Sequence, residues 1–193
     1  MDFRGPYTQA LDLVGALVAR LTDDDLERVT PCRAWIVHDI VEHLVDRQHM
    51  MIGLLRDTAP APIEGDLRTA FAAAHRTLLE LLPDDSFLRR EVHAPFGVLP
   101  GNSMLAVHFS DLITHGWDLT QSLDEPYAPP PALLEIAIAI VATFPDTPSV
   151  RGEHNAHFRP ARTVAADAPA LDRLVAATGR DPRWRDELTR TSR

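Results

Sequence analysis

Apolar residues recur at the spacing of an amphipathic α-helix in four long segments of this chain. In the first, predicted as a helix over residues 6–21, Leu11, Val14 and Val18 stand at positions i, i+3 and i+7 and so share one face. The other three segments cover residues 37–56, 66–82 and 102–122. Prolines interrupt the pattern, as in residues 58–62, because proline cannot continue a helix. The pattern therefore predicts an all-α fold in which helices pack on helices.

Shorter elements are expected around these four helices. The pattern predicts a fifth helix over residues 132–144, a short helix over 170–178, an extended stretch over 88–93 and irregular chain over 145–168 and 179–193. Asn102 and Ser103 are suited to cap the fourth helix. Phe158, Val164 and Trp184 are the expected anchors of the C-terminal chain, with Trp184 alone holding the tail. No linker is long enough to divide the chain, so all 193 residues are predicted to form a single domain, a four-helix bundle with additional short helices and an irregular C-terminal segment.

The charge and the cysteine count exclude several classes of function. The chain has a formal net charge of −9 and no lysine, so binding to nucleic acid or to an anionic membrane is not expected, because both are polyanions. The longest apolar stretch, residues 136–144, is far short of the ~20 residues that span a bilayer. The N-terminus lacks the apolar core of a signal peptide, and Cys32 is the only cysteine. These features predict a cytoplasmic protein that acts on a small molecule, and its apolar helices permit a homodimer.

Four polar side chains are spaced to share one face of the predicted helix over residues 102–122. They are His108, Asp111, His115 and Asp118, at successive spacings of 3, 4 and 3. Such spacings return to the same side of a helix with 3.6 residues per turn. An imidazole and a carboxylate one turn apart can grip one metal ion, as side chains do in the helical H-E-x-x-H motif. Asp111 and His115 therefore form the centre of a candidate metal site.

His43 is placed to complete this site from the second helix. It lies beside Ile40 and Leu44, near the face that is expected to pack inward. Two imidazoles and a carboxylate that leave one position open suit Zn²⁺, Fe²⁺ or Ni²⁺. The alternative is that His43 is a core histidine whose hydrogen bonds are satisfied, and that Asp111 and His115 lie on the solvated face of a helix. Three roles are left open for His108 and Asp118: they orient a ligand, they contact substrate, or they are ordinary polar residues.

Two segments resemble the signatures of a known family. Residues 30–44, TPCRAWIVHDIVEHL, resemble a motif of the DinB-like metalloproteins, most closely those related to the N-terminal domain of mycothiol-dependent maleylpyruvate isomerase. Residues 111–119, DLITHGWDL, resemble the D-x-x-x-H-G-W-D-L motif of the same group. The ending over residues 171–182 is also similar, so the resemblance extends over nearly the whole chain in the same order. Ala34 and Thr120 depart from the glycine and alanine usual in the group, and neither is an expected ligand.

The resemblance implies a four-helix bundle that binds one divalent ion near one end through His43, Asp111 and His115. Zinc is the first expectation for this ion, with nickel and iron as alternatives, and mycothiol is the implied thiol cosubstrate. Under this interpretation His108 and Asp118 are the expected catalytic residues and act by orienting a ligand. Cys32 is expected to be structural, because the family does not need it as a nucleophile.

Three functions are compatible with such a site. The first is a metal-dependent thiol transferase or isomerase, because a bound metal lowers the pKa of a thiol and the thiolate is the attacking species. The second is a hydrolase, in which the ion activates water instead. The third is a non-catalytic metal-binding or small-molecule-binding protein. A fully coordinated ion would favour the third function, and an accessible ion beside an apolar pocket would favour the first two.

Overall fold

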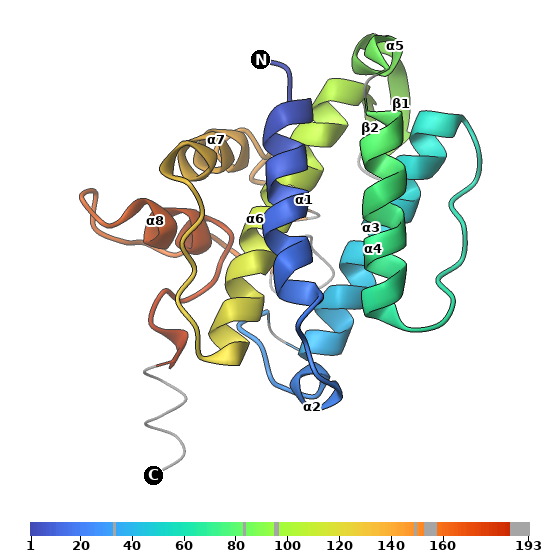
Figure 1. Cartoon of the computed structure of the whole chain (residues 1–193). Coiled ribbons are helices and arrows are strands. Elements are labelled where there is room, and N and C mark those ends of the chain that lie inside the picture. Colours follow the sequence, from blue (N-terminus) through green and yellow to red (C-terminus); the bar gives the residue numbers. More distant parts are fainter. Residues whose placement is uncertain (33, 83, 95–96, 149, 153–157, 186–193) are drawn as a thin grey trace.

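Four long helices form the centre of the molecule (Figure 1). They are α1 (Arg4–Val18), α3 (Val37–Arg56), α4 (Leu67–Leu81) and α6 (Gly101–Leu123). α1 packs against α4 and α6, and α3 packs against the same two helices, so the four close into a bundle. The computed structural model describes every residue except 33, 83, 95–96, 149, 153–157 and 186–193. The predicted all-α four-helix bundle is confirmed, and the single-domain organisation stays a prediction.

The smaller elements decorate the ends and one side of the bundle. They are α2 (Asp23–Leu26), α5 (Asp85–Arg89), β1 (Glu91–Ala94), β2 (Gly97–Pro100), α7 (Pro131–Val141) and α8 (Ala170–Ala177). β1 and β2 pair antiparallel, with Val92 opposite Leu99, and form the only sheet of the described residues. The extended stretch predicted over residues 88–93 is therefore right from Glu91 onward, while Leu88 and Arg89 end α5.

Local hydrogen bonds fix the ends of the helices. At the start of α3 the Asp39 carboxylate accepts a hydrogen bond from the Ile36 backbone N–H at 2.9 Å, and Asp57, with a left-handed φ of 58°, ends the helix. At the start of α4 the Asp66 carboxylate accepts from the Thr69 N–H at 3.0 Å. Each carboxylate satisfies a donor that would otherwise lack an intrahelical partner. α3 accordingly has the bounds that its sequence predicts.

The predicted cap of the fourth helix is wrong. α6 begins at Gly101, directly after Pro100, and Asn102 lies inside its first turn. The Asn102 side chain instead holds the N-terminus of the chain: its oxygen accepts from the Phe3 N–H at 3.0 Å, and its nitrogen donates to the Met1 carbonyl at 2.9 Å. A side chain suited to capping is thus used for a contact between distant parts of the chain.

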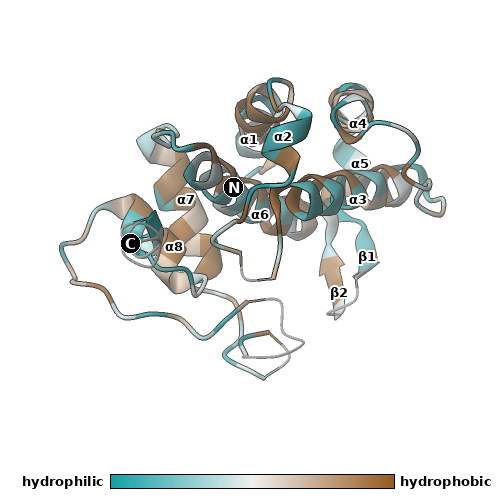
Figure 2. Cartoon of the chain, turned by 90° about the horizontal axis from the view of Figure 1, so that it is seen from below, coloured by the Kyte–Doolittle hydropathy of each residue, from teal (hydrophilic) through white to brown (hydrophobic). Residues whose placement is uncertain are grey.

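α6 is buried on nearly all sides. An apolar stripe of this helix, Leu105, Leu112 and Leu119, lies in the core. α1 and α3 pack on α6 within the bundle, and α7 packs on it from outside. Figure 2 shows α7 as largely hydrophobic, which fits its position between α6 and α8. Polar residues on a helix this deeply buried need hydrogen-bonding partners. The polar face of α6 is therefore an internal surface of the protein.

The C-terminal chain is held by more than its aromatic residues. Phe158 is half-buried and stacks on Phe144 with ring centroids 5.3 Å apart, as expected of an anchor. The prediction that Trp184 alone holds the tail is wrong, because Arg180 and Asp181 are buried as well.

No helix in the described part of the chain combines the length and the apolarity that a bilayer crossing requires.

Candidate metal centre

The three predicted metal ligands meet where α3 packs on α6. His43 Nε2 lies 2.9 Å from Asp111 Oδ2, and His115 Nε2 lies 3.4 Å from Asp111 Oδ1. One ligand atom from each of the three side chains lies within 4.8 Å of the other two. The fold thus brings together residues separated by 68 positions in the sequence, in a donor set of two imidazoles and one carboxylate.

The cluster is open on one side and closed on the other. The side chains of His43 and Asp111 are 25% and 20% exposed, whereas His115 is 6% exposed. His115 is therefore the inner member of the cluster, and His43 and Asp111 border solvent. A metal ion held by all three would be accessible from the side of His43 and Asp111, as a catalytic site with an open position requires.

The charges of the cluster depend on one another. Burial opposes ionisation of Asp111, but His43 and His115 outweigh it and hold the pKa of this carboxyl well below its usual range. Burial also opposes protonation of His115, yet Asp111 and Asp118 raise its pKa to about 9. Without metal, His115 is therefore an imidazolium held between carboxylates at neutral pH. An incoming cation would take the place of a proton.

Asp118 holds the inner imidazole from behind. Its Oδ2 lies 2.9 Å from His115 Nδ1, and its side chain is fully buried. Arg180 neutralises it, with Nη2 2.7 Å from Oδ2 and Nε 3.0 Å from Oδ1. Burial opposes ionisation of Asp118, but Arg180 and His115 keep its pKa lowered. Asp118 is thus placed to orient His115. Arg180 was not predicted as part of the site, because nothing in the sequence pattern of the tail marks it as buried.

His108 lies one turn before Asp111 but outside the group of converging ligand atoms. It is buried, and burial lowers its pKa to about 4, so its ring is neutral at pH 7. The ring of Tyr7, from α1, packs edge-on against it at 6.4 Å between centroids. Tyr7 Oη is buried and finds no hydrogen-bond partner among the described residues. Tyr7 was not among the residues predicted for the site.

Trp35 and Cys32 border the cluster from the loop before α3. The Trp35 ring lies 5.0 Å from the His43 ring and stacks on His115 at 5.7 Å and 20°. Trp35 therefore forms a wall of the site, while Trp117 is part of the core. Cys32 has its sulfur within 4.8 Å of ligand atoms of His115 and Asp118. Burial raises the pKa of its thiol to about 12, and the structural role expected for it stays a prediction.

A hollow of about 530 Å³ lies next to the cluster. It is lined by Val29, Thr30, Pro31, Ala34, Trp35, Ile36, Arg159, Arg162, Gly179, Arg180, Asp181 and Trp184. Trp35 and Arg180 belong both to this lining and to the surroundings of His115. The hollow lies between the loop before α3 and the C-terminal segment. None of the three predicted ligands lines it, and it adjoins the candidate metal centre through Trp35 and Arg180.

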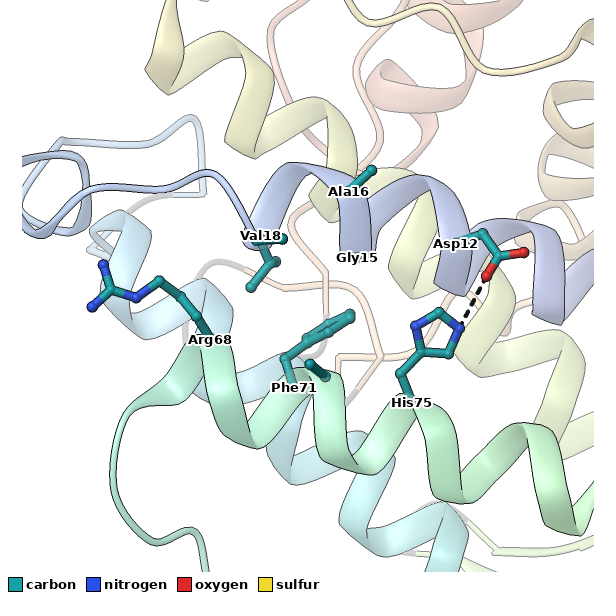
Figure 3. Close-up of a pocket in the computed structure, with 9 residues that line it drawn as sticks. Asp12, Gly15, Ala16, Val18, Arg68, Phe71 and His75 are labelled. Carbon is teal, nitrogen blue, oxygen red and sulfur yellow. Dashed lines mark ion pairs between the residues drawn. The ribbon is translucent and has the colours of Figure 1, made fainter.

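A second, smaller hollow lies between α1 and α4 (Figure 3). Its volume is about 150 Å³, and an ion pair between His75 Nε2 and Asp12 Oδ1, 3.1 Å apart, lies at its edge. None of the three predicted ligands lines it. This shallow depression lies where Gly15, which has no side chain, faces the Phe71 ring and His75. It is not part of the site.

Gly116, beside His115, is required by close packing. A Cβ at this position would lie 2.4 Å from the Oη of Tyr127, a buried residue that follows α6. We expect Gly116→Ala to lower the free energy of unfolding by about 1–2 kcal/mol, because overpacking exceeds the gain in helix propensity. Urea denaturation measures this change. Gly5→Ala is the matched control, since Gly5 lies in α1 and a Cβ added there would have no atom within 4 Å; equal effects of the two substitutions would contradict the prediction.

The stability of the metal-free protein is expected to fall at alkaline pH. Histidine in an unfolded chain has a pKa near 6.5, and in the fold that of His115 is about 9. The folded state binds this proton more tightly, so the stabilisation is fully present below about pH 6.5 and is lost as the pH rises through 9. Urea midpoints measured in EDTA from about pH 6 to 9.5 should show this decline. A decline of the same size in His115→Gln would assign it to other groups.

Comparisons with known proteins support the family resemblance over part of the chain. Residues 7–82 match the family model of the mycothiol maleylpyruvate isomerase N-terminal domain, which confirms the resemblance predicted from the sequence. This range includes His43 but neither Asp111 nor His115. Two uncharacterized proteins of Mycobacterium tuberculosis, from strains CDC 1551 and H37Rv, are each 26% identical over 184 residues, which cover 95% of this chain and 100% of the relative. No solved structure matches the chain.

Proposed function

We propose that this protein is a metal-dependent enzyme in which a divalent ion at His43, Asp111 and His115 serves to activate a thiol, as in mycothiol-dependent transferases and isomerases. The single observation that carries the proposal is the convergence of these three ligand atoms within 4.8 Å of one another, open to solvent on one side. The resemblance of residues 7–82 to a mycothiol-related domain supports the choice of a thiol as cosubstrate.

The chemistry of the donor set fits such an ion. Two imidazole nitrogens and one carboxylate leave a position for a further ligand and suit zinc first, with nickel and iron as alternatives. Asp118, behind His115, supplies the outer carboxylate that metal-bound histidines ordinarily have. When bound, the ion supplies a Lewis acid that lowers the pKa of a thiol in the open position.

The residues around the cluster have separable roles in this proposal. His43 and Asp111 hold the ion at the border with solvent, where a thiol can reach it. Trp35, which stacks on His115 and lies against His43, would form a wall of the site. His108, a neutral imidazole one turn from Asp111, is placed to orient a ligand or to accept a proton. The hollow of about 530 Å³ is of the size that small-molecule sites have and would take the organic part of the cosubstrate or acceptor.

Cobalt substitution tests the proposal directly. Protein freed of metal and reconstituted with Co²⁺ should bind one ion per chain. Titration with N-acetylcysteine, and then with mycothiol, should produce a thiolate-to-cobalt absorption band at a pH below the ordinary thiol pKa of ~8.5. Cys32→Ser should show the same band, which would exclude the protein's own sulfur as its source.

Three other results would replace this function with an alternative. Cobalt that binds without any thiolate band, together with metal-dependent ester or amide hydrolysis, would identify a hydrolase. Binding of cobalt with neither a thiolate band nor hydrolysis would leave a non-catalytic metal-binding protein, and the absence of stoichiometric binding would leave a polar core cluster.

A further inference from the structure

We propose that Arg180 is a positioning residue of the metal centre: through Asp118 it fixes the ring of His115, so that docking of the C-terminal segment sets the affinity for the ion. The proposal rests on the proposed function in that it assumes an ion at His43, Asp111 and His115. It adds a residue far outside the family-matched range 7–82.

The first step is how the chain delivers Arg180 to the site. α8 ends at Ala177, and Gly179 then takes a left-handed φ of 84°, which reverses the chain. A Cβ on Gly179 would lie 2.4 Å from that of Arg159, so the turn requires glycine. The Arg180 N–H bonds the Val175 carbonyl at 2.9 Å. The side chain of Arg180 is thereby directed back toward α6, where it is 8% exposed.

The second step is the bond between Arg180 and Asp118. The guanidinium donates through Nη2 to Oδ2 at 2.7 Å and through Nε to Oδ1 at 3.0 Å, a two-pronged contact across 62 residues. Such bidentate pairs fix both distance and orientation. Arg180 therefore holds the Asp118 carboxylate in place through two donors.

The third step leads from Asp118 to the ligand. Asp118 Oδ2, which accepts from the Arg180 guanidinium, also lies 2.9 Å from His115 Nδ1, so the same carboxylate sets the orientation of the imidazole ring. The other ring nitrogen, Nε2, then faces Asp111 at 3.4 Å, on the side where His43 also lies. Loss of a partner that orients a metal-bound histidine typically weakens metal binding 10- to 100-fold.

The chain of contacts also couples the ion to the C-terminal segment. α8 packs on α7, and an exposed ion pair of Arg173 with Glu135, 3.1 Å apart, joins the two helices. Arg180 links the same segment to α6. If docking of Arg180 strengthens metal binding, then metal binding must strengthen docking by the same factor.

The experiment compares zinc affinities of arginine variants of the full chain by competition with a chromophoric chelator. We expect Arg180→Gln to bind zinc 10- to 100-fold more weakly than the wild type and Arg180→Lys to recover part of the loss. Arg173→Gln removes an arginine of the same segment without touching Asp118, and should change the affinity less than about twofold. Zinc should also slow trypsin cleavage after Arg183 in the wild type and not in Arg180→Gln.

Three results would overturn the proposal. The first is a folded Arg180→Gln with wild-type zinc affinity. The second is an equal loss in Arg173→Gln, which would mean that segment docking in general, and not Arg180, is responsible. The third is a folded Arg180→Lys that loses as much zinc affinity as His115→Ala. Because Arg180→Lys keeps a buried cation, it tests the positioning role even where Arg180→Gln does not fold.

Failure of the metal site itself is distinguishable. If the wild type binds no zinc, the proposed function fails, and the link from Arg180 to His115 is then tested in the metal-free protein. ¹⁵N-histidine spectra should show a slowly exchanging Nδ1–H resonance that is absent in His115→Gln. Loss of this resonance in Arg180→Gln but not in Arg173→Gln supports the positioning role, and its persistence in Arg180→Gln overturns it.

Discussion

Replacing Asp118 by leucine should cost about 3–5 kcal/mol of the free energy of unfolding, the range seen when one partner of a buried ion pair is removed. Asp118 is fully buried and receives hydrogen bonds from both Arg180 and His115. Its removal would leave the Arg180 guanidinium buried without a counter-charge, and the imidazolium of His115 would lose one of two flanking carboxylates. Urea denaturation of the metal-free protein at pH 7 measures the loss.

A double variant separates the charge effect from the loss of packing. Asp118→Leu combined with Arg180→Met removes both charges and keeps apolar volume, and should recover much of the stability lost in Asp118→Leu alone, because buried ion pairs can be replaced by apolar pairs at little cost. A double variant that is less stable than the single one would show that Arg180 has other partners in the fold. A loss below about 1 kcal/mol in Asp118→Leu would contradict burial of the pair.

Removal of either His43, the ligand that borders solvent, or His115, the buried ligand, should nearly abolish metal binding. Zinc sites with four ligands are worth roughly 10–16 kcal/mol, so the loss of one imidazole is expected to weaken binding roughly 10²- to 10³-fold. Elemental analysis after dialysis should find about one equivalent of a transition metal in the wild type and none in His43→Ala or His115→Ala. The same two variants should release cobalt to a weak chelator that leaves the wild type loaded.

His75 provides a matched control for this experiment. Its Nε2 lies 3.1 Å from Asp12 Oδ1, a histidine–carboxylate pair much like that of His43 and Asp111 but without a third ligand in the described structure. His75→Ala should therefore keep the full metal content. Loss of metal in this variant as well would indicate general destabilisation, and metal retained in both His43→Ala and His115→Ala would place the ion elsewhere.

Helix positions were predictable because their signals are local. α3 has the predicted bounds of residues 37–56, and α4 and α8 lie within one residue of theirs. α1 begins at Arg4 and ends at Val18, against a prediction of 6–21, and the cap assigned to Asn102 was wrong. Boundaries are less predictable because capping side chains also have tertiary partners, as Asn102 has in Phe3 and Met1.

The candidate site likewise has one part that was predictable from the sequence and one part that was not. The shared face of Asp111, His115 and Asp118 is a property of helical periodicity, and the spacing alone predicts it. His43 could be proposed as the third member because a helix with an inward face must pack on another helix. Trp35 lies in the motif of residues 30–44, but its stacking on His115 could not be read from that motif. Arg180 had no comparable signal, since it belongs to a segment whose own pattern is that of a charged tail.

The helices, the polar face of residues 108–118 and the family resemblance were predictable because they depend on residues close together in the chain. The contact of His43 with Asp111, the stacking of Trp35 on His115 and the neutralisation of Asp118 by Arg180 were not, because they exist only in the folded chain. Burial explains the difference. A charge such as that of Arg180 leaves water only when the folded chain supplies its partner, and that partner lies 62 residues away.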